Sequence, residues 1–191
     1  IFTANELHVP VGETVVVHLT SVDVVHSFWV PSLAPKLDAI PGQERTLWFN
    51  AVAPGVYRGY CSEFCGIAHT WMQFPVQAVS AGDYQAWVRA QQQSGAAPTG
   101  LAARGQQIYE SQTCGNCHAI TGLGSNARVG PNLTHVASRP YIGSGVLTNT
   151  PQNMYLWLQN PPAVKPGVSM PNYRFSPDDL AAITAYMESL R

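Results

Sequence analysis

The stretch CSEFCGIAHTWM, residues 61–72, decides how the first half of the chain is interpreted, because it concentrates potential metal ligands. Two cysteines, a histidine and a methionine lie within it, at positions 61, 65, 69 and 72. Thiolate, imidazole and thioether are soft or borderline ligands, which favour copper over magnesium or calcium. A blue copper site with one ion uses a single thiolate, two imidazoles and a weak axial methionine. The second cysteine therefore needs another explanation.

Two cysteines four residues apart can hold two thiolate sulfurs between two metal ions. Each ion then needs its own imidazole, and the stretch itself supplies only His69. The second is predicted to be His26 in DVVHSFWVP, where the alternation of Val25 and His26 indicates the end of a strand. A distant histidine combined with a ligand-rich loop is typical of copper proteins. Two alternatives are a Cys61–Cys65 disulfide and a structural zinc ion held by two cysteines and two histidines, but both leave Met72 unexplained.

This stretch and its flanks resemble the binuclear copper domain, CuA, of cytochrome c oxidase subunit II. The resemblance extends through residues 23–31 (DVVHSFWVP), 36–42 (KLDAIPG) and 57–61 (YRGYC). In that family the two cysteine sulfurs bridge both coppers, each histidine binds one copper, and the methionine and a backbone carbonyl are weak outer ligands. Carried over position by position, the resemblance implies the copper ligands His26, Cys61, Glu63 through its carbonyl, Cys65, His69 and Met72.

The same resemblance implies a magnesium site close to the copper centre. In intact oxidases the glutamate side chain at this loop position helps to bind magnesium where subunit II meets subunit I. Glu63 occupies that position, and Asp38 in the matching segment KLDAIPG is a further candidate. We therefore expect the carboxylate of Glu63 to contribute to magnesium binding at the interface with subunit I.

The second half of the chain is organised by a CxxCH motif, which is typical of c-type haem attachment: Cys114-Gly115-Asn116-Cys117-His118. Two thiols at this spacing add to the two vinyl groups of haem, and the adjacent histidine is delivered to the iron as its proximal ligand. A CxxCH motif also occurs by chance or within a zinc site, so the surrounding sequence decides its interpretation.

Residues 101–191 resemble a class I cytochrome c. The pattern comprises an opening helix, CxxCH, the segment GPNL at residues 130–133, a middle helix, a methionine before a proline, and a closing helix. The resemblance implies a haem c that is attached covalently through thioether bonds to Cys114 and Cys117, with His118 and Met170 as the two axial ligands of the iron. Histidine with methionine places the iron potential in the range of electron carriers.

Three further residues bear on the assignment of the haem ligands. The resemblance implies that the carbonyl of Pro131 accepts a hydrogen bond from the proximal histidine, which fixes the imidazole. Met154 and Met187 lie at helical positions and are interpreted as packing residues, which leaves Met170 as the sixth ligand.

The pattern of apolar residues divides the chain into two parts of different class. From residue 7 to about 79, alternating residues such as those at 15–20 and frequent Pro and Gly predict short strands of a β-sandwich. Residues 80–90 read as a helix capped by Ser80 or Asp83, and residues 91–100 lose all periodicity. We expect a mainly β cupredoxin-like sandwich at 1–90, a linker at 91–100 and an all-α class I cytochrome c domain at 101–191. The names cupredoxin and cytochrome c are what the resemblances imply.

Composition excludes some classes of function. Formal net charge is −1 with no run of basic residues, which argues against a nucleic-acid partner. The four cysteines form two tight pairs and leave none for a structural disulfide. No stretch reaches the roughly 18 apolar residues of a membrane helix. The chain begins as if cut from a longer protein, and the resemblance implies that two transmembrane helices and a first, tryptophan-rich strand precede it.

A copper domain followed by a cytochrome c on one chain is the arrangement of subunit II in caa3-type oxidases. The resemblance implies that a donor cytochrome reduces haem c, which reduces copper, which in turn reduces haem a of subunit I for oxygen reduction coupled to proton pumping. It also implies a location on the outer, periplasmic face of a bacterial cytoplasmic membrane. The alternatives are a free periplasmic copper–haem shuttle, the electron-entry part of a nitrous-oxide or nitric-oxide reductase relative, and a haem peroxidase with a vacant sixth position.

Overall fold

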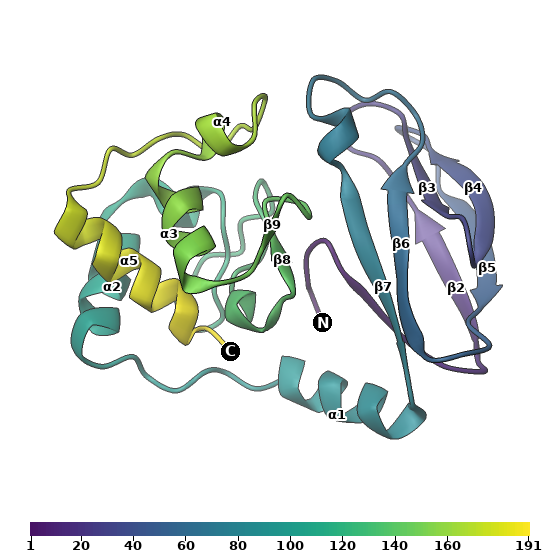
Figure 1. Ribbon diagram of the computed structural model, residues 1–191, viewed down its shortest axis with the longest axis horizontal. Helices are drawn as coiled ribbons and strands as arrows, with labels where there is room; N and C mark the ends of the chain where they lie inside the picture. The colour runs from purple at the N-terminus through teal and green to yellow at the C-terminus, as the bar shows by residue number, and fades with distance from the viewer. The chain divides into compact units, whose positions relative to one another are not determined.

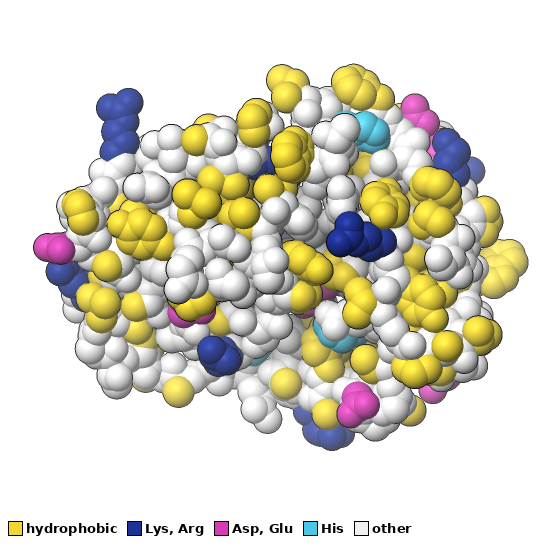
Figure 2. All heavy atoms as spheres, viewed as in Figure 1, with side chains coloured by type: hydrophobic (Ala, Val, Ile, Leu, Met, Phe, Trp, Pro, Cys, Tyr) yellow, Lys and Arg dark blue, Asp and Glu magenta, His cyan; other side chains and the backbone are white.

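The structure is a computed structural model that describes all 191 residues. The chain forms two compact units (Figure 1): residues 5–90 make up one, and residues 91–191 together with residues 1–4 make up the other. No helix in either unit is both long and apolar enough to span a bilayer. Charged side chains are sparse on the face shown in Figure 2, in keeping with a charged fraction of only 11%.

The first unit is a β-sandwich, as predicted. Its larger sheet has the order β1-β7-β6-β3-β4, with β1 parallel to β7 and the other pairs antiparallel. Two further strands, β2 and β5, form a separate antiparallel pair. The strands are β1 (Leu7–Pro10), β2 (Thr14–Leu19), β3 (His26–Val30), β4 (Ala34–Ala39), β5 (Arg45–Asn50), β6 (Gly55–Cys61) and β7 (Gln73–Val79).

Alternation along the strands builds the core of this unit. Strand β2 turns Val15 and Val17 inward, and its partner β5 buries Leu47 and Phe49. The intervening residues face outward, so that Trp48 is 71% exposed. The period of two therefore separates one buried and one exposed face on each strand, which is the pattern of a sheet that packs on one side only.

Helix α1 (Ala81–Gln91) follows β7 directly. Of the two predicted caps, Ser80 is the one that acts, since its hydroxyl accepts a hydrogen bond of 3.1 Å from the backbone N–H of Asp83. Trp87 stacks on the imidazole of His8 with ring centroids 4.2 Å apart, which joins the helix to β1. Beyond α1, residues 92–99 contain no helix or strand.

The second unit is helical apart from the two-residue strands β8 (Tyr141–Ile142) and β9 (Leu147–Thr148). Its α-helices are α2 (Gly100–Ser111), α3 (Pro151–Gln159), α4 (Pro161–Val164) and α5 (Pro177–Ser189), with short 3-10 turns at η2 (Thr113–Asn116) and η3 (Val136–Ser138). Ser176 caps α5 by accepting a 3.2 Å hydrogen bond from the N–H of Asp179.

Helices α2 and α5 pack closely because Gly105 has no side chain. A Cβ at Gly105 would collide with the backbone carbonyl of Ala182 and with the Cβ of Tyr186. The tyrosines of the two helices, Tyr109 and Tyr186, meet edge to face at 6.0 Å. Met154 and Met187 are almost fully buried in the core of this unit, as their helical positions suggested.

Candidate metal centres

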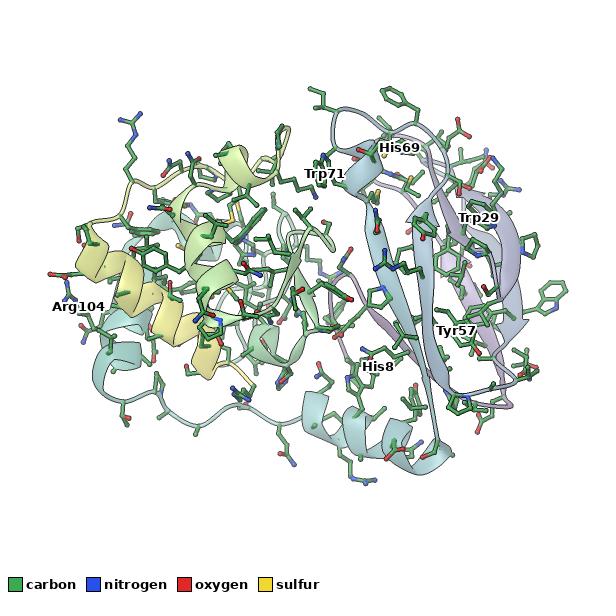
Figure 3. The ribbon with its side chains drawn as sticks, in the orientation of Figure 1. His8, Trp29, Tyr57, His69, Trp71 and Arg104 are labelled. Atoms are coloured by element: carbon green, nitrogen blue, oxygen red, sulfur yellow. The ribbon has the colours of Figure 1, made fainter.

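The first candidate site lies where β3 and β6 run side by side. Cys61 is the last residue of β6 and His26 the first of β3, and the pairing of Phe28 with Cys61 brings them together. The loop that follows leads through the short turn η1 (His69–Trp71) into β7, and Figure 3 shows His69 and Trp71 on it. The loop is closed by a 3.0 Å hydrogen bond from the N–H of Cys61 to the carbonyl of Met72.

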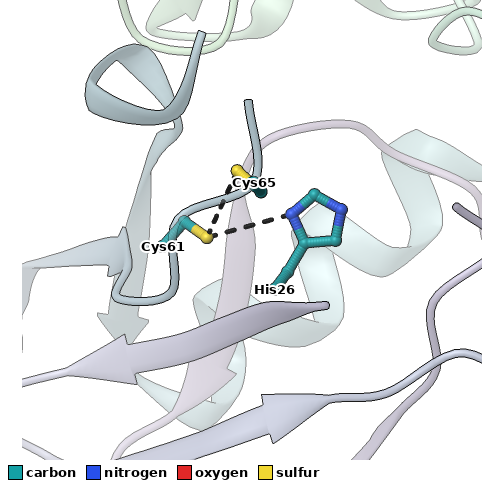
Figure 4. A group of neighbouring side chains, drawn as sticks. All are labelled: His26, Cys61 and Cys65. Carbon is teal, nitrogen blue, oxygen red and sulfur yellow. Dashed lines mark hydrogen bonds between the residues drawn. The ribbon is translucent and has the colours of Figure 1, made fainter. Parts of the chain in front are cut away.

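The structure brings all six predicted copper ligands together. The two sulfurs, Cys61 Sγ and Cys65 Sγ, are 3.7 Å apart, and each faces a different imidazole. Figure 4 shows both cysteines with His26, the imidazole that faces Cys61. Cys61 Sγ lies 3.8 Å from His26 Nδ1 and 3.3 Å from the carbonyl oxygen of Glu63. Cys65 Sγ lies 3.5 Å from His69 Nδ1 and 3.9 Å from Met72 Sδ.

These distances suit a pair of metal ions that share both sulfurs. A disulfide requires about 2.05 Å between sulfurs, so the two thiols are not linked here. Metal–thiolate bonds are about 2.3 Å long, so one ion can reach two sulfurs 3.7 Å apart. His26, Cys61 and Cys65 form one group with ligand atoms within 4.8 Å of one another, and His69 extends it beyond Cys65. The donor set therefore fits two copper ions with one imidazole each.

The two thiols differ in acidity. Burial raises the pKa of Cys61, but backbone hydrogen bonds at Ser27 and Glu63 and the contacts with His26 and Cys65 lower it to about 7. Burial and the neighbouring Cys61 raise the pKa of Cys65 to about 11. In the metal-free pair Cys61 is therefore the thiol that ionises first, around neutral pH, while Cys65 stays protonated.

Asp23 is a functional residue that the sequence reasoning missed. Its carboxylate accepts a 2.9 Å hydrogen bond from Nε2 of His26, which turns Nδ1 toward the sulfur of Cys61. Burial lowers the pKa of His26, but the bonds to Asp23 and Cys61 outweigh it and raise the pKa overall. The signal was present in the sequence as an acidic residue three positions before the histidine in DVVH.

The backbone carbonyl and the side-chain carboxylate of Glu63 have different partners. Its carbonyl is directed to Cys61, while its carboxylate lies 3.9 Å from the ammonium of Lys36 on β4. Asp38, the further magnesium candidate, lies on the same strand and accepts a hydrogen bond from Arg45 through its backbone carbonyl. Neither carboxylate belongs to a group of three potential ligands, so within this chain they do not form a complete magnesium site.

The second candidate site is built on a tight turn of the helical unit. The N–H groups of Cys117 and His118 both donate to the carbonyl of Cys114, at 3.1 and 2.9 Å, which gathers the CxxCH residues on one turn. His118 Nδ1 lies 2.8 Å from the carbonyl oxygen of Pro131. Its backbone carbonyl accepts a 2.8 Å hydrogen bond from the hydroxyl of Tyr109. The Pro131 contact thus orients the imidazole and the Tyr109 hydrogen bond fixes the backbone of His118, with Nε2 left for a ligand.

Gly130 completes the setting of this histidine. A Cβ at Gly130 would collide with the ring of His118, so only glycine allows the GPNL segment to lie flat against the imidazole. Burial lowers the pKa of His118, and the Pro131 hydrogen bond only partly offsets this. The imidazole is therefore neutral at neutral pH, which is the form that binds a metal.

The remaining haem residues share the same core. Cys114 and Met170 both pack against the hydrophobic cluster of this unit, and both cysteines of the motif are free. Two thiols at CxxCH spacing, followed by an imidazole whose Nδ1 is held by Pro131, are the donors that covalent haem attachment requires. The residues therefore fit a covalently attached haem.

The fold and the two candidate metal centres define the class: a cupredoxin-like domain joined to a helical domain of the cytochrome c type. Residues 1–79 match the family model of the cytochrome c oxidase subunit II periplasmic domain, and residues 102–191 match that of cytochrome c. The chain belongs to the cytochrome c oxidase subunit II family, in the form that carries a cytochrome c domain.

Two relatives match the chain over its full length. The chain is 40% identical over 193 residues to cytochrome c oxidase subunit 2 of Alkalihalophilus pseudofirmus, and the match covers 100% of this chain and 56% of that protein. The corresponding protein of Bacillus sp. (strain PS3) is 32% identical over 204 residues, with 57% of its length covered. The chain thus spans a little over half the length of these relatives. The crystal structure of the periplasmic domain of cytochrome oxidase subunit II from Bradyrhizobium japonicum is 38% identical, with a TM-score of 0.44, and the match covers 45% of this chain and 62% of that one.

Proposed function

We propose that this chain is the electron-entry part of a caa3-type haem–copper oxidase. Its helical unit would hold haem c and its β-sandwich would hold binuclear copper, and these groups would supply one-electron transfer from an external donor to haem a of subunit I, where oxygen reduction is coupled to proton pumping. The observation that carries the proposal is the presence of two sets of candidate ligands on one chain. One is the sulfur–imidazole cluster around Cys61 and Cys65, and the other is the CxxCH turn with Met170.

The β-sandwich holds the copper ligands in a preformed arrangement. His26 and Cys61 come from adjacent strands, so backbone hydrogen bonds between β3 and β6 set their separation. In this proposal Cys61 and Cys65 share two copper ions, His26 and His69 bind one each, and Met72 and the Glu63 carbonyl lie outside them. Ligands that barely move keep the reorganisation on electron transfer small.

The helical unit supplies two protein ligands to the iron. In this proposal Cys114 and Cys117 would hold haem through thioether bonds, and His118 and Met170 would be the two protein ligands of its iron, with Pro131 fixing the histidine. Because two protein ligands would complete the coordination of the haem iron, no position would remain on the iron for oxygen or peroxide. The chain transfers electrons, and the oxygen chemistry belongs to another subunit.

The proposed domain boundaries are those of the sequence prediction: a copper domain at 1–90, a linker at 91–100 and a cytochrome domain at 101–191. A linker of about ten residues gives the tethered cytochrome an effective concentration in the millimolar range near its acceptor. The cytochrome domain would thereby replace a diffusing carrier between the external donor and the copper centre.

The proposed setting is the outer face of a bacterial cytoplasmic membrane. Subunit I and an external cytochrome donor are the proposed partners, with anchoring through membrane helices outside these residues. Magnesium is proposed at the interface with subunit I, where the carboxylate of Glu63 would exchange Lys36 for the ion. The ligands that complete that site would come from the partner subunit.

The test is an optical and electron paramagnetic resonance study of the oxidised, metal-loaded chain, with copper and iron counted per chain. We expect two coppers and one low-spin haem, with a seven-line signal because two equivalent copper nuclei share the unpaired electron. Cys61→Ser should abolish the seven-line signal and leave the haem spectrum unchanged. A single copper with a four-line signal, or zinc in its place, would refute the proposed copper centre.

A further inference from the structure

Met170 lies on a segment that has few attachments of its own. Residues 166–176 contain no helix or strand, and they separate α4 from α5. Within the segment, the N–H of Arg174 donates to the side chain of Asn172 at 2.8 Å. Arg174 adopts a left-handed backbone conformation with φ of 53°, which completes a tight turn just after Met170.

Tyr173 is the residue that ties this segment to the rest of the unit. Its ring stacks on that of Phe175, with centroids 5.5 Å apart and planes 17° from parallel, and Phe175 packs against the hydrophobic core. Its hydroxyl shares a 2.8 Å hydrogen bond with the hydroxyl of Thr113, 60 positions earlier in the chain. Among the side-chain hydrogen bonds of residues 166–175, this is the one that reaches outside the segment.

Thr113 is itself fixed to the haem-attachment turn. It is the first residue of η2 and immediately precedes Cys114, whose carbonyl receives the hydrogen bonds of Cys117 and His118. The hydroxyl pair therefore joins two parts of the haem site that are far apart in sequence. One is the turn with both cysteines and one axial ligand, and the other is the segment with the second axial ligand, Met170.

We propose that the Thr113–Tyr173 hydrogen bond is a latch that holds the Met170 segment closed, which makes Tyr173 a positioning residue for the sixth ligand. The inference rests on the proposed haem c site with Met170 bound to iron. When the latch opens, the segment keeps only its local turn and the packing of Phe175 and Met170. Methionine then leaves the iron more often, and a small external ligand takes its place.

The expected effect is modest because the hydrogen bond is exposed and competes with water. Its net contribution corresponds to about a twofold to tenfold change in the equilibrium between closed and open segments. An external ligand that binds only the open form gains apparent affinity by the same factor. Imidazole is a suitable probe, because it binds ferric haem only after the axial methionine has left.

The experiment is an imidazole titration of the full, haem-loaded ferric chain. Tyr173→Phe keeps the ring and its stack on Phe175 but removes the hydroxyl, and Thr113→Val removes the other partner. Each should raise the apparent imidazole affinity about twofold to tenfold, and the double variant should gain no more than either one alone. Thr113→Ser, which keeps a hydroxyl, should resemble the parent chain.

Tyr155→Phe is the matched control, since it deletes a tyrosine hydroxyl of the same unit that makes no hydrogen bond in the structure. Unchanged imidazole affinity in Tyr173→Phe, or independent and additive effects of the two single changes, would overturn the latch. Failure of the haem assignment looks different. In that case the parent ferric chain would lack the methionine-to-iron charge-transfer band, and Met170→Ala would leave its imidazole affinity unchanged.

Discussion

Gly105→Ala tests the packing on which the cytochrome unit depends. The added methyl group would collide with the carbonyl of Ala182 and the Cβ of Tyr186, at the crossing of α2 and α5. Both obstacles are backbone or backbone-proximal atoms, so no flexible side chain can move aside. The helices must separate by about 1 Å, which forfeits a quarter to a half of the dispersion energy across their contact.

Two opposing terms set the magnitude. Alanine in the interior of a helix is favoured over glycine by about 1 kcal/mol. Overpacking a close contact costs about 1–3 kcal/mol, and a collision with backbone belongs at the upper end of that range. The difference is a net loss of about 2 kcal/mol in the free energy of unfolding, and a fall of roughly 10 °C in the melting temperature of a unit of this size.

The assay is guanidinium unfolding of the haem-loaded chain, followed by haem absorbance so that the transition reports the cytochrome unit. Gly82→Ala in α1 is the control, because a Cβ there meets only the Ser80 hydroxyl, at an ordinary 3.8 Å. That variant should leave the cytochrome transition where it is in the parent chain. An unchanged or higher midpoint in Gly105→Ala would refute the close-packed crossing.

Three further predictions concern the metal centres. Asp23→Asn should weaken copper binding by about tenfold to a hundredfold, because the carboxylate that orients His26 is lost. A copper affinity equal to that of the parent chain in a chelator competition would contradict this. In the metal-free chain, the rate of Cys61 alkylation should rise with pH through about 7, because only the thiolate reacts, while Cys65 should stay unreactive until about pH 11. Peptide mass spectrometry can follow each cysteine separately, and one shared midpoint would argue against the difference in acidity. Met170→Ala should lower the haem potential in a redox titration and allow carbon monoxide to bind the reduced haem, and absence of binding would exclude Met170 as the sixth ligand.

Short-range features of this protein were readable from sequence because they depend on local chain geometry. The spacing within CxxCH is enough to place Cys114, Cys117 and His118 on one turn. The capping pattern at Ser176 predicts where α5 begins, and the structure agrees. Alternation in β2 predicts which of its residues face the core, because the side-chain period of a strand is two.

Relations between distant segments were decided only by the tertiary structure. Sequence suggested His26 as a metal ligand, but the pairing of β3 with β6 is what brings it to Cys61. Asp23 was missed because its role depends on where the imidazole of His26 points.

The helical unit also depends on contacts between residues that are far apart in sequence. The meeting of Gly105 with Ala182, and of Thr113 with Tyr173, joins residues at least 60 positions apart. Local propensity sets which elements form. The choice of partners is made by the burial of all the apolar faces at once, and a stretch of sequence considered by itself carries no information about that choice.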